Sequence, residues 1–188
     1  MKYLDDDVVQ ELLEGKWLQI AEAIEDAFVD ESAEMVPKVY LDGWGGDFRA
    51  MPAALGDYAA VKWIGVFPSN WKKAKHTTAG TLVLSDRRTG QTLLAMDCRT
   101  LTAYRTAVTS AIAAKYCAPD AKEFAIIGCG LQGRYHIEAY EAICCNHMNL
   151  SLELYDTNES SMMQMFNWLG REKLSHAWGR NKSVKETI

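Results

Sequence analysis

The first segments of the chain show the hydrophobic spacing of amphipathic helices. Three aspartates, Asp5 to Asp7, precede the run VVQELL and are suited to cap a short helix. From about residue 16 to residue 29, small and hydrophobic side chains recur at helical spacing, with acidic residues between them. The pattern therefore predicts two consecutive helices at the start of the chain.

Short hydrophobic runs replace this helical pattern in the next part of the chain. They are rich in β-branched and aromatic residues, and Gly, Pro, Asn and Asp residues separate them, which is typical of strands joined by turns. The segment SDRRTGQT lies between two of the runs and predicts a hairpin. The predicted strand regions are VPKVYLD, AAVKWIGVF, AGTLVLSD and TLLAMDC.

The rest of the pattern alternates between helix and strand. Helical spacing from Thr102 to Tyr116, with Thr100 or Thr102 as the cap, ends before Pro119, which breaks a helix. A strand, a helix, a second strand, a second helix and a polar tail follow. The four elements are predicted at about residues 124–128, 131–145, 150–155 and 158–170.

This order of elements predicts an α/β protein with two domains. Residues 1–118 are expected to form an α+β domain, because strand-rich segments lie there between helices. Residues 119–188 are expected to form an incomplete Rossmann domain, since strand–helix–strand in this order begins a doubly wound parallel sheet.

Composition and charge exclude several classes of protein. The chain has 188 residues, of which 48% are hydrophobic and 24% charged, which is ordinary for a globular protein. Its net charge of −5 argues against nucleic acid or an anionic membrane as a partner. No hydrophobic run approaches the roughly 20 residues of a membrane-spanning helix, and the acidic N-terminus lacks a signal-peptide core, so we expect a cytoplasmic protein. The five cysteines and four histidines show no metal-ligand spacing, and no metal is expected.

The segment KEFAIIGCGLQGRYHIEAY carries the strongest sign of a cofactor. A hydrophobic strand leads directly into Gly128, Gly130 and Gly133, and a helix follows. In a dinucleotide-binding turn the first glycine makes the sharp exit, the second leaves room for the pyrophosphate, and the third lets the helix pack against the strand. The N–H groups at the helix start, at Leu131 and Gln132, would face the phosphates. Because the glycines lie between a strand and a helix, the motif predicts dinucleotide binding.

A carboxylate at the end of the next predicted strand supports this prediction. The run LSLELYD ends at Asp156, where a carboxylate accepts hydrogen bonds from the adenosine ribose hydroxyls. The same charge repels the 2′-phosphate of NADP, and we therefore predict NAD as the favoured cofactor. Asp156 is also suited to cap the helix that opens with DTNES, and the two roles are compatible.

Motifs in the first half of the chain point to a family. The segments VPKVYLDGWGGDFRAMPAAL, AAVKWIGVFPSN, TLVLSDRRTGQTLLAMDCRTLTAYRTAVTSAIAAKY and AIIGCGLQG occur in this order. The chain resembles the ornithine cyclodeaminase/mu-crystallin family, and within it is most similar to the archaeal alanine dehydrogenase branch. The resemblance covers essentially the whole chain. It implies that residues 1–118 bind the substrate and build the subunit interface of a homodimer.

The resemblance also implies an NAD-dependent oxidoreductase that acts on an amino acid or its imine. Hydride passes between the α-carbon and the nicotinamide, and the imine is released as a keto acid or closed into a ring. An α-carboxylate needs fixed cations, and the amine needs a nearby acid or base. Four basic residues fall on positions that the family uses at its substrate site, namely Lys38, Arg49, Lys62 and Arg105.

These four residues are expected to differ in role. Arg49 and Arg105 are permanently charged and fork-shaped, and are the predicted carboxylate clamps, with Lys38 at the rim. Lys62 lies in an apolar strand, where a lysine without a function is costly, and is the predicted catalytic residue. For each of the other three taken alone, an ordinary surface charge is the alternative.

Two further implications concern the cofactor and the length of the chain. Thr77 and Thr106 match family positions that contact the cofactor. Family members are longer, complete the nucleotide-binding sheet after NKSVKETI and carry a catalytic aspartate there, so the resemblance implies a truncated chain that is inactive by itself and associates with itself. The alternatives are a non-catalytic ligand-binding or dimerisation module of the mu-crystallin type and a plain NAD-binding regulator.

Overall fold

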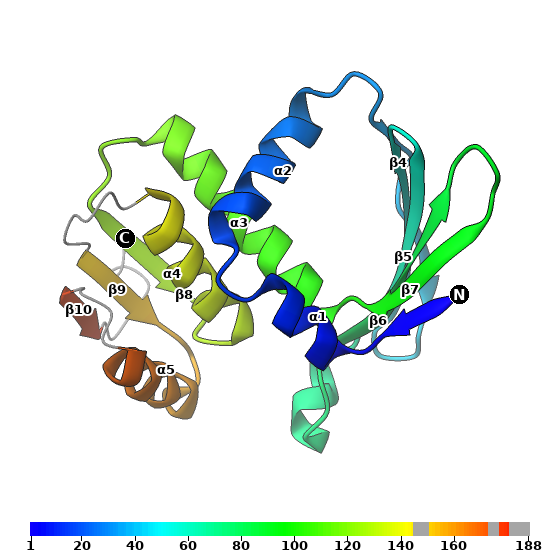
Figure 1. The fold of residues 1–188 in the computed structure, drawn as a ribbon. Helices are drawn as coiled ribbons and strands as arrows, with labels where there is room; N and C mark the ends of the chain where they lie inside the picture. The colour runs from blue at the N-terminus through cyan, green and yellow to red at the C-terminus, as the bar shows by residue number, and fades with distance from the viewer. Residues whose placement is uncertain (145–150, 173–176, 181–188) are drawn as a thin grey trace. The chain divides into compact units, whose positions relative to one another are not determined.

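The chain folds into two compact units (Figure 1). The computed structural model describes residues 1–144, 151–172 and 177–180. The first unit comprises residues 1–16 and 23–102, and the second comprises residues 17–22 and those from 103 onward. Helices α2 (Trp17–Val29) and α3 (Arg99–Cys117) each contribute to both units. The domain boundary predicted near residue 118 stays a prediction.

The first unit contains one seven-stranded sheet with the order β1-β7-β6-β5-β4-β2, in which β3 also pairs with β4. Strand β1 runs parallel to β7, and the remaining pairs are antiparallel. Helix α1 (Asp6–Leu13) follows β1, and a short 3₁₀ helix, η1 (Pro68–Lys73), joins β5 to β6. The strands are β1 (Lys2–Leu4), β2 (Glu34–Met35), β3 (Val39–Asp42), β4 (Asp47–Leu55), β5 (Tyr58–Val66), β6 (Thr78–Asp86) and β7 (Thr92–Asp97).

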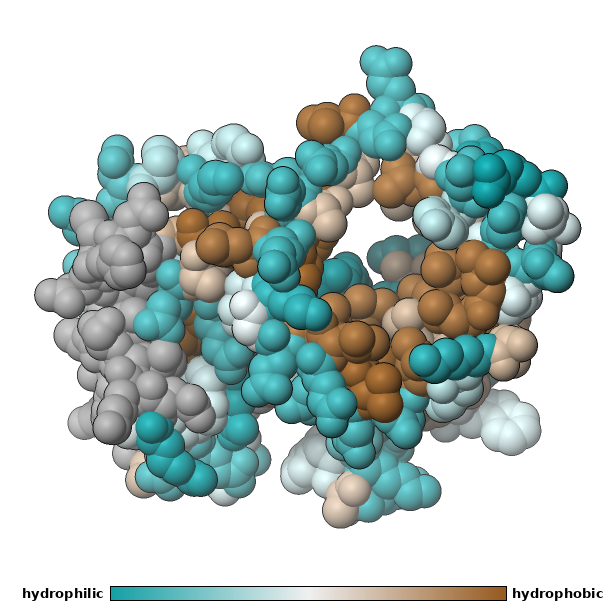
Figure 2. All heavy atoms as spheres, viewed as in Figure 1, coloured by the Kyte–Doolittle hydropathy of each residue, from teal (hydrophilic) through white to brown (hydrophobic). Residues whose placement is uncertain are grey.

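Hydrophobic spacing predicted much of this sheet. The four predicted strand regions became β3, β5, β6 and β7, and β6 and β7 form the predicted hairpin. Strands β1, β2 and β4 were not predicted. Figure 2 shows that hydrophobic residues reach the surface over β5–β7, so this unit does not hide all of its apolar side chains.

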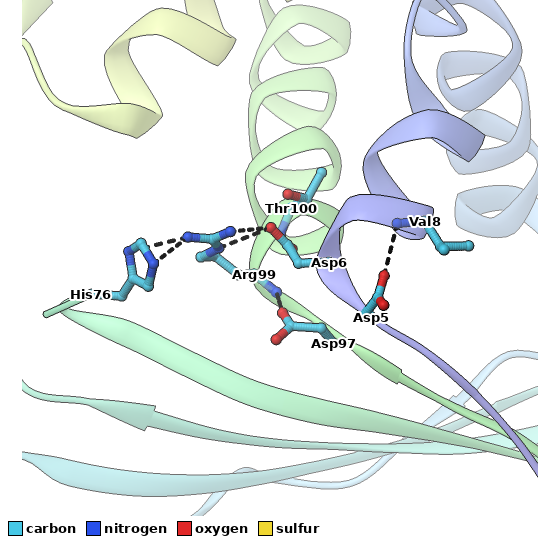
Figure 3. A network of polar contacts seen from close by, with 7 residues as sticks. All are labelled: Asp5, Asp6, Val8, His76, Asp97, Arg99 and Thr100. Atoms are coloured by element: carbon cyan, nitrogen blue, oxygen red, sulfur yellow. Dashed lines mark hydrogen bonds and ion pairs between the residues drawn. The ribbon is translucent and has the colours of Figure 1, made fainter.

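Helix α3 begins at Arg99, before the predicted cap at Thr100 or Thr102, and carboxylates from outside the helix take the role of the cap (Figure 3). Asp97 Oδ1 accepts the N–H of Arg99 at 2.8 Å, and Asp6 Oδ1 accepts the N–H of Thr100 at 3.0 Å. The Arg99 guanidinium donates to Asp6 Oδ2 through Nε, at 3.0 Å, and through Nη2. These acceptors satisfy amides that a helix leaves without partners in its first turn, so α1 and α3 are joined by charge-assisted hydrogen bonds.

The second unit contains a three-stranded parallel sheet with the order β10-β9-β8. Its elements alternate as predicted up to α5, which confirms the strand–helix–strand–helix pattern and the α/β fold class. Strand β10 differs from the prediction of a polar tail, because it is short and forms by backbone pairing with β9. Residues 181–188, predicted to precede a further strand, lie outside the described residues. The elements are β8 (Glu123–Ile127), α4 (Leu131–Cys144), β9 (Ser151–Tyr155), α5 (Glu159–Glu172) and β10 (Ala177–Arg180).

A hydrophobic core lies between this sheet and its two helices. Ile126 of β8 and Leu154 of β9 pair across the sheet and are buried. Met165 of α5 is fully buried against them, in a cluster that also contains Ile137 of α4. Burying side chains of this size stabilises the unit by about 1.5–3 kcal/mol each.

Aromatic rings pack the start of α2 against α3, and α3 against α4, within the second unit. The ring centroids of Trp17 and Tyr104 lie 4.3 Å apart, and Tyr135 meets the Tyr104 ring edge-on at 5.0 Å. At the next residue of α4, His136 Nε2 lies 3.1 Å from the Ser110 hydroxyl. Helix α4, which follows the glycine turn, is therefore supported by packing on two sides.

The contact between Asp6 and α3 predicts the first mutational effect. Burial alone would raise the pKa of the Asp6 carboxyl, but hydrogen bonds from Arg99 and Thr100 outweigh it, and the pKa lies below its ordinary value. The folded-state pKa is thus depressed, so this stabilisation is present above the unfolded-state pKa and is lost as pH falls through the folded-state pKa. We expect Asp6→Asn to lower the free energy of unfolding by about 1–3 kcal/mol at pH 7, measured by urea titration.

The exposed neighbour Asp7 provides the matched control for this prediction. Asp7→Asn should change the free energy of unfolding at pH 7 by less than about 0.5 kcal/mol. The Asp6→Asn protein should also lose less stability than the parent between pH 5 and pH 2. Equal acid sensitivity of the two proteins would contradict the role given to Asp6.

Candidate functional site

The three predicted glycines of the second unit meet three different spatial demands. Gly128 follows β8 with φ +111°, a conformation that side chains rarely adopt. A Cβ at Gly133 would lie 2.4 Å from the carbonyl oxygen of Gly128, so the first turn of α4 approaches the end of β8 too closely for any side chain. A Cβ at Gly130 would meet nothing within 4 Å, which leaves open space above the turn. This is the geometry that a dinucleotide-binding turn requires.

The start of α4 provides donors beside that open space. Leu131 and Gln132 are exposed and lie in the first turn of the helix, where amides have no acceptor within the helix. The positive end of the helix dipole lies at the same point. Together with Gly130, these residues fit a pyrophosphate.

The carboxylate of Asp156 lies against the glycine turn. Its Oδ2 accepts the N–H of Cys129 at 2.7 Å, and its Oδ1 accepts the N–H of Asn158 at 2.7 Å. Each oxygen keeps a lone pair, because a carboxylate oxygen accepts two hydrogen bonds, and so the group can also accept from ribose hydroxyls. The side chain of Asn158 accepts the N–H groups of Ser160 and Ser161 and therefore caps α5 in place of Asp156.

The residue between the first two glycines is chemically inert. Cys129 is buried, with 2% of its surface exposed, and its Sγ lies 3.8 Å from the carbonyl oxygen of Tyr155. Burial, with a smaller contribution from the Asp156 charge, raises the pKa of the Cys129 thiol to about 11. A thiol in this state is not a nucleophile at neutral pH, so Cys129 fills space in the turn.

In the first unit, Lys62 extends from the middle of β5 toward the start of α3. It stands opposite Met51 of β4 and Leu82 of β6, and its Nζ lies 3.5 Å from the hydroxyl of Thr102. Burial raises the pKa of the nearby Cys98 thiol, and the positive charge of Lys62 partly offsets that effect. Lys62 is half-buried, which is the setting expected of a functional lysine.

Arg49 shares this face of the sheet with Lys62. Strand register sets it opposite Ile64, two residues from Lys62, and opposite Tyr40 of β3, whose ring centroid is 5.5 Å from the guanidinium carbon. Asp47 already holds Arg49 by two hydrogen bonds, at 2.5 Å from Nε and 3.0 Å from Nη2. This pairing lowers the pKa of the Asp47 carboxyl and raises that of Arg49, so both groups are charged at neutral pH.

Of the other predicted residues in the first unit and on α3, three are exposed and one is half-buried. Lys38 is exposed just before β3, and Thr77 is exposed, with its carbonyl oxygen accepting the N–H of Phe67 at 2.8 Å. Arg105 is exposed and Thr106 half-buried on the part of α3 that belongs to the second unit. The structure therefore brings Arg49 and Lys62 to one face, while their convergence with Arg105 on a single ligand stays a prediction.

Sequence reasoning missed several groups around these residues. It gave no role to Asp47, although an aspartate two positions before an arginine on a strand lies on the same face and is a recognisable signal. The hydroxyl of Thr102, beside Lys62, carried no such signal. The amide of Cys129 that Asp156 holds could not be inferred either, because it depends on the path of the backbone.

Among the described residues, no group of three or more His, Cys, Asp or Glu side chains is arranged to hold a metal ion. Within the same residues, no helix is both long enough and apolar enough to cross a membrane.

The comparison with models of protein families shows to which family the chain belongs. The model of the ornithine cyclodeaminase/mu-crystallin family matches residues 4–180. The chain belongs to this family. The match confirms the resemblance inferred from the sequence motifs, and it extends over both units.

Two relatives of the chain carry the names of enzymes that act on amino acids. The chain is 40% identical over 125 residues to an alanine dehydrogenase of Archaeoglobus fulgidus, covering 64% of this chain and 39% of that protein. It is 36% identical over 133 residues to an ornithine cyclodeaminase of Agrobacterium fabrum, covering 70% of this chain and 38% of that protein.

Two solved structures share the fold over the full length of the chain. An archaeal alanine dehydrogenase dimer with bound NAD superposes with a TM-score of 0.86 at 29% identity, covering 100% of this chain and 57% of that one. The Δ¹-pyrroline-2-carboxylate reductase of Thermococcus litoralis, in complex with NADH and L-proline, gives a TM-score of 0.88 at 26% identity, covering 100% and 58%. The chain thus spans less than two thirds of these relatives.

The unequal surroundings of the glycines generate a stability prediction. We expect Gly133→Ala to lower the free energy of unfolding by about 1–3 kcal/mol, because the new methyl group would push α4 away from β8. Gly130→Ala should change it by less than about 0.5 kcal/mol, because the methyl group enters open space. Urea unfolding of the two variants beside the parent measures the difference, and similar losses for both would contradict the geometry of the turn.

Proposed function

We propose that this protein binds NAD and acts as an oxidoreductase on an amino acid or on its imine. The single observation that carries the proposal is the glycine turn of the second unit, with open space at Gly130 and the Asp156 carboxylate beside it. Family membership supports it, as do the relatives with bound NAD and NADH.

Residues of the second unit suit the pyrophosphate and the adenosine ribose of the cofactor. Gly130, Leu131 and Gln132 would receive the pyrophosphate, and Asp156 would accept hydrogen bonds from the ribose. The charge of Asp156 disfavours a 2′-phosphate, which favours NAD over NADP. When bound, NAD supplies the hydride-accepting group of the reaction.

The residues of the first unit suit a small carboxylate. Lys62 and Arg49 lie on one sheet face and both carry positive charge beside partly apolar surroundings. Asp47 occupies two of the five N–H donors of Arg49, so the others remain for a ligand carboxylate. We assign Lys62 the transfer of a proton to or from the substrate amine, with Lys38 and Arg105 as further contacts to the substrate.

The cofactor proposal predicts the effect of closing the open space at Gly130. Gly130→Val should abolish NADH binding, because its side chain would occupy the position of the pyrophosphate, while the thermal midpoint should stay within a few degrees. Titration of nicotinamide fluorescence measures the binding. Gly170→Ala in α5, where a Cβ also meets nothing within 4 Å, is the matched control. Unchanged NADH affinity in the Gly130→Val protein would overturn the cofactor site.

The substrate proposal predicts the effect of removing the charge of Lys62. Lys62→Met should weaken binding of pyruvate, used as a keto-acid probe in the presence of NADH, by about 10- to 100-fold, which is the scale of one charge-assisted hydrogen bond. Isothermal titration calorimetry measures the affinity. Lys73→Met in the exposed η1 segment is the control and should have no effect. Equal affinity of the Lys62→Met protein and the parent would exclude Lys62 from the site.

A second candidate function, a dimerisation module, is favoured by the opposite face of the same sheet. Strand register places Tyr3, Val39, Leu41, Val61 and Trp63 on that face, and each is between 36% and 57% exposed. Exposed apolar patches of this kind mark interaction sites. The two functions are compatible, because Lys62 and Arg49 lie on the other face.

A second copy of the chain is the partner that this face suits. The face of β4, β5 and β6 that includes Trp63 carries no charged residue, so these strands of two copies would bring no like charges together. Glu34 of the neighbouring β2 lies on the same face and is paired with Arg87. A hollow of about 380 Å³, lined mainly by small apolar residues of the same strands, can receive side chains from a partner. The archaeal alanine dehydrogenase that shares the fold is a dimer.

This assembly predicts the effect of a charge in the middle of the face. Trp63→Glu should convert the chain from dimer to monomer in sedimentation velocity, because two buried carboxylates would face each other across the interface. Trp71→Glu in η1, where the side chain is 63% exposed, should leave the dimer unchanged. A parent chain that sediments as a monomer would reject this face as an interface.

A further inference from the structure

Two consecutive residues hold the glycine turn beside β9: Tyr155, which ends that strand, and Asp156, which follows it. The N–H of Gly128 donates to the carbonyl oxygen of Tyr155 at 2.8 Å, which continues the backbone pairing of the two strands. The next amide, that of Cys129, donates to the Asp156 side chain at 2.7 Å. A side chain therefore takes over as acceptor at the point where the backbone of the turn leaves the sheet.

We propose that Asp156 is a positioning residue that holds the glycine turn in its binding conformation before any cofactor arrives. The inference rests on the proposed function for its purpose, and on the two hydrogen bonds that Asp156 accepts for its geometry. Asp156 thereby couples the ribose position to the pyrophosphate position, because one carboxylate serves both.

The composition of the turn makes such a contact necessary. Gly128 and Gly130 have wide conformational freedom, and ordering them costs more entropy than ordering other residues. Cys129 is the residue between them whose side chain is buried, and its amide is fixed by an ionised acceptor, which forms stronger hydrogen bonds than a neutral one. Fixing that one amide restricts both flanking glycines.

The other oxygen of Asp156 fixes the carboxylate itself. Oδ1 accepts the N–H of Asn158, whose side chain caps α5, so the carboxylate is held between the glycine turn and the start of a helix. The two amides reach different oxygens of the carboxylate. In the same orientation an asparagine presents one oxygen and one NH₂ donor, so it would leave one of the two amides facing a donor.

This double attachment constrains cofactor specificity. Replacing Asp156 to admit a 2′-phosphate would also release the Cys129 amide and loosen the turn. A single substitution at this position is therefore expected to lower affinity for NADH and NADPH together, with an additional loss for NADH from the missing ribose contact. The loss of affinity that both cofactors share measures the effect on the turn, and the additional loss for NADH measures the missing ribose contact.

Amide hydrogen exchange of the cofactor-free chain, followed by NMR, tests the proposal. In Asp156→Ala the amides of Cys129 and Asn158 should exchange about 10- to 100-fold faster than in the parent, the factor expected for one lost charge-assisted hydrogen bond. In Asp156→Asn one of the two amides should stay protected and the other should lose protection. If Asp156 served only to bind the ribose, its replacement would change the exchange rate of neither amide.

Two internal references separate this effect from general unfolding. The amide of Ile126 in β8 should keep its protection in every variant, which shows that the sheet is intact. Asp120→Asn, which removes an exposed carboxylate elsewhere in the second unit, should leave the Cys129 amide unchanged. Unaltered exchange at Cys129 in Asp156→Ala, with Ile126 protected, would overturn the proposal. This outcome is independent of NADH binding, so the proposal and the proposed function can fail separately.

Discussion

The absence of a side chain at Gly133 is the constraint on which the second unit depends. The carbonyl oxygen of Gly128 occupies the place where a Cβ would stand, so α4 can rest directly on the end of β8. That close approach allows Ile137 and Met165 to close over Ile126 in one core. It also turns the start of α4 toward the open space at Gly130, which means that packing and ligand access follow from the same contact.

The first unit depends on electrostatic contacts at the start of α3. Asp6 and Asp97 satisfy the first amides of that helix, and Arg99 links Asp6 to the ring of His76. The helix start is thus held in place beside the chain segment that precedes β6, and Thr102 is presented to Lys62 from a fixed position.

The extent to which the sequence predicted this structure follows from the range of the forces involved. Helices and most long strands were predictable, because their hydrophobic spacing repeats within a short window. Strand β4 was missed because Pro52 interrupts its pattern. The structure tolerates Pro52 between the parts of β4 that pair with β3 and β2, where a residue without an N–H is least costly. The glycines and Asp156 were predictable because their motif is local, whereas the contact of Asp6 with Arg99 joins distant parts of the chain and left no local pattern.

The buried thiol in the glycine turn has a consequence for the chain's response to oxidants. Because burial raises the pKa of the Cys129 thiol to about 11, this residue stays protonated at pH 7, and the thiolate is the form that peroxide attacks. The turn therefore contains sulfur without becoming a redox sensor. Among the cysteines that the structure describes, Cys117 is exposed at the end of α3 and is open to such reagents, so oxidants would modify it before Cys129 and leave the glycine turn chemically unchanged.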